Sequence, residues 1–450
     1  MSPAGEKQWT VLAYMAGDNN LSDAALADLH EMKKLGSTPE VDVVAQLDRS
    51  GKTVSKRYHL RQGSDLGADA VGDVGETNTG DPAVLESFLR WGMKAYPAKK
   101  YLVILWNHGA GWDDEDIYRT ARSEMGLGIT RRGQVVPPSS RESEETISVR
   151  RVRTVGSKPL RRALFKTTIA SALRPGAASR AIAFDDTSKD FLDNIEMKKV
   201  LTAVTKDLGR KIDILGMDAC LMSMAEVAYQ VRDSVAITVG SEEVEPSDGW
   251  PYDAILKELA SQPEMTPEEL AVLIVQKYVA SYASDSDVTQ AACDLNKCGS
   301  LAGAMDQLAK ALIPGFSDPT VRSAIFEARE RVQDYDVQDY VDLYNFCDLL
   351  ARKISDGPVR TACHKVMETI LKPGFVLDSG FKGTRMQHSY GVSVYFPRKE
   401  ISPLYATLDL TREIAWQRFL KKYSDEKRQP DRGAETRDPD IRSSRTGPPA

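Results

Sequence analysis

Two short apolar runs in this chain each lead into a reactive side chain, and they constrain the fold more than any other feature. Residues 101–106 are followed closely by His108, and residues 212–217 are followed closely by Cys220. Short apolar runs rich in β-branched residues and ended by polar or small ones are typical of buried strands. A His and a Cys at the ends of two such strands meet the needs of a thiol nucleophile and its acid–base partner. The sequence therefore predicts an α/β fold and a candidate cysteine hydrolase.

Length and composition are those of a soluble globular protein. The 450 residues suffice for two or three domains, and 42% of them are hydrophobic. The net charge of −6 gives no reason to expect nucleic acid or an anionic membrane as a partner. No apolar run approaches the ~20 residues that cross a bilayer.

The chain start and the cysteines bear on the compartment. The first ten residues lack a basic segment followed by an apolar one, so a cytoplasmic location is expected for the chain as written. A start further upstream would leave room for a secretion signal. The five cysteines are odd in number and lack zinc-finger spacing, which favours free thiols over a disulfide framework or a metal site. They are Cys220, Cys293, Cys298, Cys347 and Cys363.

Predicted strands and helices alternate along the first half of the chain. This alternation favours a mostly parallel sheet covered by helices on both faces. The Asp81-Pro82 pair is typical of a helix start, with Pro at the first helical position. Strands are expected at 9–15, 41–47, 101–106, 181–186, 212–217 and 234–240, and helices at 21–35, from Pro82, at 194–208 and at 221–232.

The composition divides the chain into segments. Residues 1–8 form a tail, and residues 9–261 form the α/β domain, with a long basic insert at 118–180. Insertions of this length without secondary structure are uncommon, and they are usually functional or disordered. Residues 262–424 are predicted to be mainly helical, except for a strand at 390–397, and residues 425–450 to be a disordered tail.

Cys220 and His108 are the candidate catalytic residues. Cys220 lies at the carboxyl end of a strand, where open α/β sheets place ligands, and a helix beginning directly after it would favour the thiolate. The alternative is a small buried hydrophobic residue, which is the interpretation for the other four cysteines. Gly109 follows His108, and its amide could donate to an oxyanion, as could that of Cys220. A His that caps a strand by hydrogen bonding is the alternative for His108.

Acidic residues near Cys220 bear on substrate choice. Asp218 lies two positions before Cys220 and so shares its side-chain direction along a strand. A carboxylate on the floor of a pocket would select Arg or Lys. Asp248 and the pair Glu242 and Glu243 could add to such a pocket, and turn caps or solvated loop charges are the alternative for each.

With these residues in view, the chain resembles the clostripain family of cysteine peptidases, relatives of the caspases, gingipains and legumains. The resemblance covers most of residues 9–424 in the family's order. It is carried by residues 9–21, 101–112, 213–220, 241–253, 340–344 and 390–397.

The resemblance implies a caspase-like αβα sandwich with a Cys/His dyad that cleaves peptide bonds after Arg or Lys. His108 matches the family's catalytic His and Cys220 its nucleophile. Asp218 matches the acidic residue of the primary specificity pocket, and Asp248 falls in a loop that is similar to part of that pocket. No third catalytic residue is implied. The expected partners are therefore peptides and proteins with Arg or Lys before the cut.

The resemblance also implies a zymogen that cleaves itself between the His and Cys strands. The basic insert supplies many sites, and we expect cleavage between Arg119 and Arg180, at Arg150, Arg151 or Arg153. The insert is longer and richer in Arg than is usual for the family, which leaves the cut site open. Some members depend on calcium. No calcium loop is recognisable in this sequence, so the expected cofactor is none and that dependence stays open.

Two other functions compete with the peptidase. A non-catalytic protein on the same fold could hold basic peptides in its acidic cleft, although retention of both His108 and Cys220 argues against it. A thiol hydrolase of non-peptide amides would differ by failing to cleave any peptide after Arg or Lys.

Overall fold

The computed structural model describes residues 6–18, 21–49, 54–107, 109, 128–129, 135–136, 181–185, 190–371 and 373–428. The basic insert therefore lies outside the described residues, apart from the short strands β6 (Gly128–Ile129) and β7 (Val135–Val136). The predicted tail at 425–450 is described only as far as residue 428.

A nine-stranded sheet organises the described part of the chain, in the order β14-β12-β11-β10-β5-β1-β2-β3-β4. The five strands from β11 to β2 are parallel, and the two strands at each end are antiparallel to their neighbours. This mixed sheet confirms the predicted α/β class. Its strands are β1 (Lys7–Gly17), β2 (Val41–Arg49), β3 (Ser55–His59), β4 (Ala70–Gly75), β5 (Ala98–Trp106), β10 (Ile212–Asp218), β11 (Val235–Gly240), β12 (Val288–Asp294) and β14 (Val376–Lys382).

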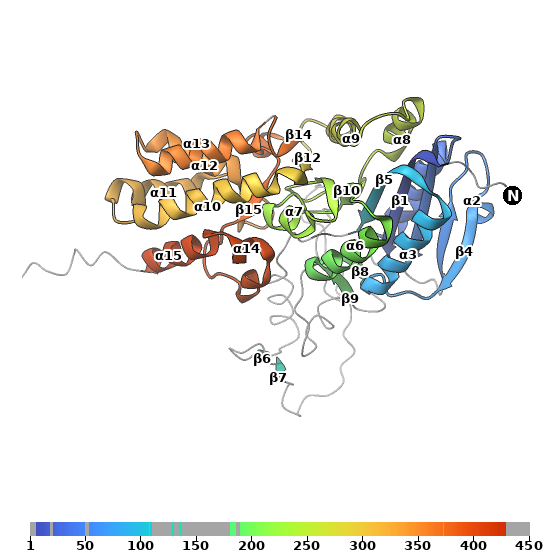
Figure 1. Ribbon diagram of the computed structural model, residues 1–450, viewed down its shortest axis with the longest axis horizontal. Helices are drawn as coiled ribbons and strands as arrows, with labels where there is room; N and C mark the ends of the chain where they lie inside the picture. The colour runs from blue at the N-terminus through green and yellow to red at the C-terminus, as the bar shows by residue number, and fades with distance from the viewer. Residues whose placement is uncertain are drawn as a thin grey trace, which may run out of the picture.

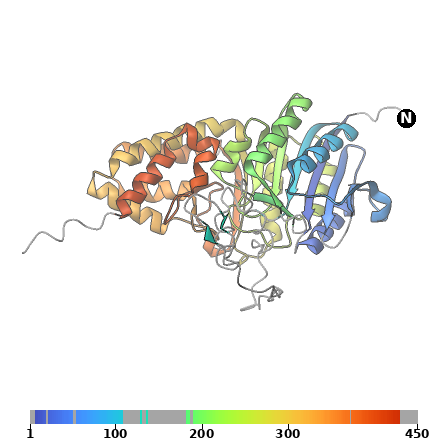
Figure 2. The same ribbon diagram turned by 90° about the horizontal axis from the view of Figure 1, so that it is seen from below.

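Helices cover both faces of the sheet, as Figures 1 and 2 show. On one face lie α1 (Ser22–Leu35), α8 (Tyr252–Ser261) and α9 (Pro267–Ser281), and on the other lie α3 (Pro82–Ala95), α6 (Asn194–Leu208) and α7 (Ala225–Val231). Alternate residues of each central strand enter the two cores, with Ile104 and Ile214 in one and Val103 and Leu215 in the other. This double burial explains why both strands are continuous apolar runs.

The predicted helix starts at Pro82 and Asn194 are confirmed and have local causes. Asp81 accepts a hydrogen bond from the amide of Ala83, and Pro82 occupies the first helical position of α3. Asp193 and Glu196 form a reciprocal capping box at the start of α6.

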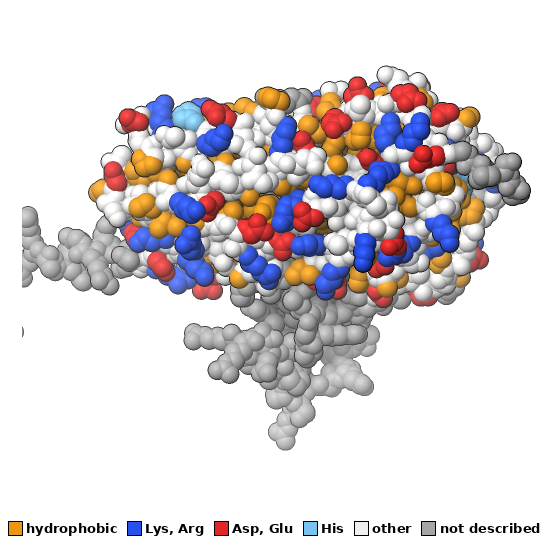
Figure 3. All heavy atoms as spheres, viewed as in Figure 1, with side chains coloured by type: hydrophobic (Ala, Val, Ile, Leu, Met, Phe, Trp, Pro, Cys, Tyr) orange, Lys and Arg blue, Asp and Glu red, His pale blue; other side chains and the backbone are white. Residues whose placement is uncertain are grey.

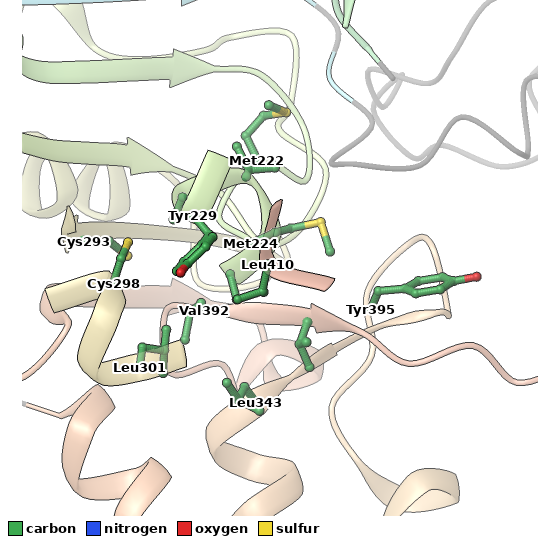
Figure 4. Close-up of a cluster of buried hydrophobic side chains, with 14 of the residues drawn as sticks. Met222, Met224, Tyr229, Cys293, Cys298, Leu301, Leu343, Val392, Tyr395 and Leu410 are labelled. Atoms are coloured by element: carbon green, nitrogen blue, oxygen red, sulfur yellow. The ribbon is translucent and has the colours of Figure 1, made fainter. Parts of the chain in front are cut away.

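The remaining helices pack beside the sheet, at the end away from β1 to β4 (Figure 1). Their apolar side chains and those of α3 and α6 belong to one continuous core. Figure 4 shows part of it, including Met222, Met224, Leu301 and Val392. The helices beside the sheet are α10 (Cys298–Gly315), α11 (Pro319–Arg331), α12 (Leu343–Lys353), α13 (Pro358–Ile370), α14 (Asp409–Glu413) and α15 (Trp416–Arg428), and the two short strands among them are β13 (Tyr340–Asp342) and β15 (Ser393–Tyr395). Short connecting elements are α2 (Leu66–Asp69), β8 (Ala181–Asp185), β9 (Asp190–Asp193), η1 (Leu295–Lys297), η2 (Thr384–Met386) and η3 (Pro403–Thr407).

The second half is mainly helical, as predicted, and it also contains strands that were not predicted. The stretch from 262 to 390 is not only helical, because β12 and β14 lie within it and extend the sheet. Residues that are depleted in strands occur in both, Asp378 and Gly380 in β14 and Ala291 and Ala292 in β12, so their pairing partners decide their conformation. The strand expected at 390–397 is short and pairs with β13 rather than with the main sheet. The predicted boundary at 261 therefore does not coincide with an edge of the sheet.

Candidate active site

The ends of β5 and β10 bring the two predicted catalytic segments together. The strands are parallel neighbours whose register pairs Trp106 with Asp218. Beyond that pair, the amide of Asn107 donates to the carbonyl oxygen of Asp218 at 3.3 Å. A methyl group built at Gly109 would lie 2.3 Å from the carbonyl oxygen of Cys220. The chain on both sides of position 108 is thus in contact with residues 218–220, whereas His108 itself lies outside the described residues.

Cys220 is a free, buried thiol at the turn that follows β10. Its sulfur accepts a hydrogen bond from the main-chain amide of Glu245 at 3.4 Å. The next residue, Leu221, has a φ of +64°, a left-handed conformation that is uncommon for residues other than glycine. Such strain is frequent at functional sites.

The helix expected directly after Cys220 begins later. Residues 221–224 form a turn, and α7 starts at Ala225 and is only seven residues long. Four residues therefore separate the sulfur from the helix, and the dipole of a helix acts mainly within its first turn. The prediction that a helix N-terminus directly after Cys220 favours the thiolate is therefore wrong. An amide from another loop contacts the sulfur instead.

Asp218 ends β10, and its side chain is fully buried. One carboxylate oxygen accepts a 2.7 Å hydrogen bond from the Tyr252 hydroxyl and a 3.4 Å bond from the amide of Trp250. The Trp250 ring covers Gly216, where a Cβ would lie 2.8 Å from the ring. Residues 250–252 therefore hold the Asp218 carboxylate in one orientation beside the Cys220 turn.

Asp248 lies two residues before Trp250. It is exposed, in a turn closed by a hydrogen bond from the Gly249 amide to the Pro246 carbonyl oxygen.

The carboxylates of Glu242 and Glu243 are buried, so neither is a solvated loop charge. Glu243 pairs with Arg385 at 2.8 Å, and Glu242 accepts from the Tyr335 hydroxyl at 2.7 Å and from the Gly391 amide at 3.0 Å. These bonds tie the loop after β11 to the C-terminal half of the chain.

Burial shifts the pKa values of Glu242 and of the nearby Asp342. It raises the pKa of Glu242 well above its usual range, and the nearby charge of Asp342 adds to the effect. Burial likewise raises the pKa of Asp342 to about 7, against the lowering effect of amide donors at Asn345 and Tyr390. At neutral pH this pair favours a shared proton over two charges.

The cleavage candidates Arg150, Arg151 and Arg153 lie outside the described part of the chain. Within that part, no group of three or more His, Cys, Asp or Glu side chains is arranged to hold a metal ion. The calcium dependence that the resemblance raises stays open. None of the helices described is long and apolar enough to span a bilayer. On the face seen in Figure 3, acidic and basic side chains are intermixed and form no broad patch of one sign.

Solved structures share this fold. A secreted C11 cysteine protease from Bacteroides thetaiotaomicron, in complex with an irreversible peptide inhibitor, is 19% identical with a TM-score of 0.58, over 93% of this chain and 99% of that one. An inactive zymogen C11 protease from Parabacteroides distasonis is 18% identical with a TM-score of 0.58, over 91% of this chain and 98% of that one. The architecture is therefore that of the C11 cysteine proteases, which confirms the caspase-like class predicted from sequence.

Sequence comparison identifies the family. Clostripain from Hathewaya histolytica is 26% identical over 387 residues, which are 75% of this chain and 61% of clostripain. The chain thus spans about three fifths of the length of that relative. The model of the clostripain family, Peptidase C11, matches residues 13–124 and 172–423. The chain belongs to the clostripain family.

Proposed function

We propose that this protein is a cysteine endopeptidase that cleaves after Arg or Lys, with Cys220 as nucleophile and His108 as its acid–base partner. The observation that carries this proposal is the contact between the ends of β5 and β10. The amide of Asn107 donates to the carbonyl oxygen of Asp218, and a Cβ at Gly109 would lie 2.3 Å from the carbonyl oxygen of Cys220. These contacts on either side of position 108 support a pairing of His108 with Cys220. Neighbouring strands lie about 4.8 Å apart, a spacing that suits a catalytic pair.

The chemistry follows from these groups. The Cys220 thiolate attacks the carbonyl carbon of the scissile bond, and the amides of Gly109 and Cys220 stabilise the oxyanion. His108 donates a proton to the leaving amine. Water then attacks the thioester with His108 as base, which releases the acid product and restores the thiol.

Asp218 supports the preference for Arg or Lys. Its carboxylate lies at the end of β10 beside the Cys220 turn and accepts a hydrogen bond from the Tyr252 hydroxyl. A guanidinium or ammonium group of a substrate would form an ion pair with this carboxylate. Asp248, exposed in the adjoining turn, would contribute at the entrance of the same pocket.

Self-processing within residues 118–180 completes the proposal. A protease with this preference would meet many Arg and Lys residues in its own insert, Arg150, Arg151 and Arg153 among them. That one structural relative was solved as an inactive zymogen supports this route of activation.

Hydrolysis of fluorogenic Arg, Lys and neutral peptides tests the function. Wild type should cleave the Arg and Lys peptides and spare the neutral one, and Cys220→Ala should cleave none. Cys293→Ala, which changes another buried free thiol, should keep the activity and serves as the control. A Cys220→Ala protein as active as wild type would refute the proposal. Peptide binding without turnover by wild type would favour the non-catalytic alternative.

A further inference from the structure

The loop at 241–245 holds the backbone around Cys220 by three hydrogen bonds. The amide of Leu221 donates to the carbonyl oxygen of Glu243 at 3.3 Å, and the amide of Ser223 donates to that of Ser241 at 2.9 Å. In return, the amide of Glu245 donates to the Cys220 sulfur at 3.4 Å. The position of this loop therefore sets where one N–H donor points relative to the nucleophile.

Thr289, in the middle of β12, holds this loop. Its buried hydroxyl oxygen accepts hydrogen bonds from two consecutive amides, Glu242 at 2.9 Å and Glu243 at 3.0 Å. The hydroxyl also lies 2.9 Å from that of Ser241, which in turn donates to the carbonyl oxygen of Glu243. A hydroxyl can accept two hydrogen bonds and donate one, so the Thr289 side chain is fully satisfied by this loop.

The carboxylates of the loop are anchored from the opposite direction. Glu243 pairs with Arg385, and Glu242 accepts from Tyr335. The Glu243 carboxylate also accepts a hydrogen bond from the amide of Val244 at 2.8 Å. The loop is thus fixed on two sides, and its last amide reaches the sulfur.

We propose that the main-chain amide of Glu245 stabilises the Cys220 thiolate and that Thr289 is a positioning residue for this amide. The inference rests on the proposed function, because it assigns a role in activating its nucleophile. A hydrogen-bond donor to the charged form of a group favours that form, so the amide increases the fraction of Cys220 that is thiolate at neutral pH. Four residues lie between Cys220 and the start of α7. The amide of Glu245 therefore supplies the stabilisation of the thiolate that was expected from a helix N-terminus.

The pH dependence of alkylation of the full-length protein tests this role. Cys220 thiolate displaces iodide from iodoacetamide to form a carbon–sulfur bond, and mass spectrometry of the Cys220 peptide measures its rate. Thr289→Val keeps the shape but removes the hydroxyl that accepts from the amides of Glu242 and Glu243, of which the Glu243 amide also donates to the Ser241 hydroxyl at 3.1 Å. We expect the apparent pKa of Cys220 to rise by about one unit, which is roughly a tenfold smaller thiolate fraction at neutral pH. Thr289→Ser should restore the wild-type profile.

Thr238→Val is the matched control. Thr238 is also a buried threonine of this sheet, on β11, and in the described residues its hydroxyl makes no hydrogen bond with the loop. It should leave the Cys220 profile unchanged, so a shift confined to Thr289→Val reports the loop and not a general loss of packing. If Thr289→Val does not fold, Ser241→Ala, which removes the neighbouring hydroxyl, should give a smaller rise in the same direction.

The outcomes separate this inference from the proposed function. An alkylation profile of Thr289→Val or Ser241→Ala equal to wild type would overturn the inference, even if wild type cleaves peptides after Arg. A shifted profile in a protein that cleaves no peptide would support the inference and refute the function.

Discussion

Gly109 lies so close to Cys220 that no side chain fits between them. A Cβ at Gly109 would be 2.3 Å from the carbonyl oxygen of Cys220 and 3.0 Å from its amide nitrogen. These are backbone atoms, which cannot yield as the end of a flexible side chain can. The contact joins the segment that follows β5 to the turn that carries the thiol.

Gly109→Ala is therefore expected to separate the two segments. A displacement of about 1 Å at a reacting group costs roughly 100-fold in rate, so we expect at least that loss in kcat/KM for an Arg peptide. Gly303→Ala on α10 is the control, because a Cβ there meets nothing within 4 Å. Its activity should match wild type, with an unfolding free energy up to about 1 kcal/mol higher. Full activity of Gly109→Ala would contradict the close contact.

Tyr252→Phe removes the 2.7 Å hydrogen bond to the buried Asp218 carboxylate. Hydrogen bonds to charged groups contribute about 1.5–3 kcal/mol, so urea denaturation should show a loss of that order. The ratio of kcat/KM for Arg over neutral peptides should also fall, because the carboxylate loses its orientation. Tyr423→Phe removes a buried hydroxyl without a partner in the described residues and should change neither quantity. An unchanged Arg preference in Tyr252→Phe would argue against Asp218 as the specificity residue.

The buried pair of Glu242 and Asp342 predicts a loss of stability at rising pH. Burial raises both pKa values, that of Asp342 to about 7, so the folded state holds protons that the unfolded chain releases near pH 4. The free energy of unfolding should fall as the pH rises from about 4 through about 7. Urea midpoints at pH 5 and pH 8 measure the fall, and Asp342→Asn should reduce it by about 1–3 kcal/mol. Asp348→Asn, which removes an ion pair with Arg352 on α12, is the control and should keep the wild-type slope.

Self-processing predicts a difference between the active protein and its Cys220→Ala variant. Purified wild type should appear as two or more fragments whose new ends fall between residues 119 and 180, and the variant should stay whole. Intact-mass measurement of both proteins shows whether the chain has been cleaved. Replacing Arg150, Arg151 and Arg153 together by Gln tests whether cleavage occurs at those sites. Identical intact masses of the two proteins would refute self-cleavage.

The parallel centre of the fold could be predicted because its strands are buried on both faces. Runs such as 101–106 are then apolar throughout, and turn or capping residues such as Asp81 and Asp193 mark where the helices begin. The antiparallel strands β12 and β14 at one end of the sheet carry no such signal. Gln290 and Ser379 give little local preference for a strand, and only the pairing with neighbours selects it.

The surroundings of Cys220 could be predicted only in part. The position at the end of a strand and the resemblance both indicated Cys220 and Asp218, but their partners come from distant parts of the sequence. Thr289 lies in an unpredicted strand, and Tyr252 begins a helix after the loop. The burial of Glu242 depends on Tyr335, which is 93 residues away. Contacts of this kind follow from the tertiary structure and leave no local pattern.

Covalent labelling of the nucleophile tests the central claim most directly. An arginine chloromethyl ketone should alkylate wild type with loss of chloride, and peptide mass mapping should find the adduct on Cys220. Labelling should be lost in Cys220→Ala and slowed at least tenfold in His108→Ala and in Asp218→Asn. An adduct on any other cysteine, or equal labelling of the His108→Ala protein, would contradict the pairing of these two residues in one site.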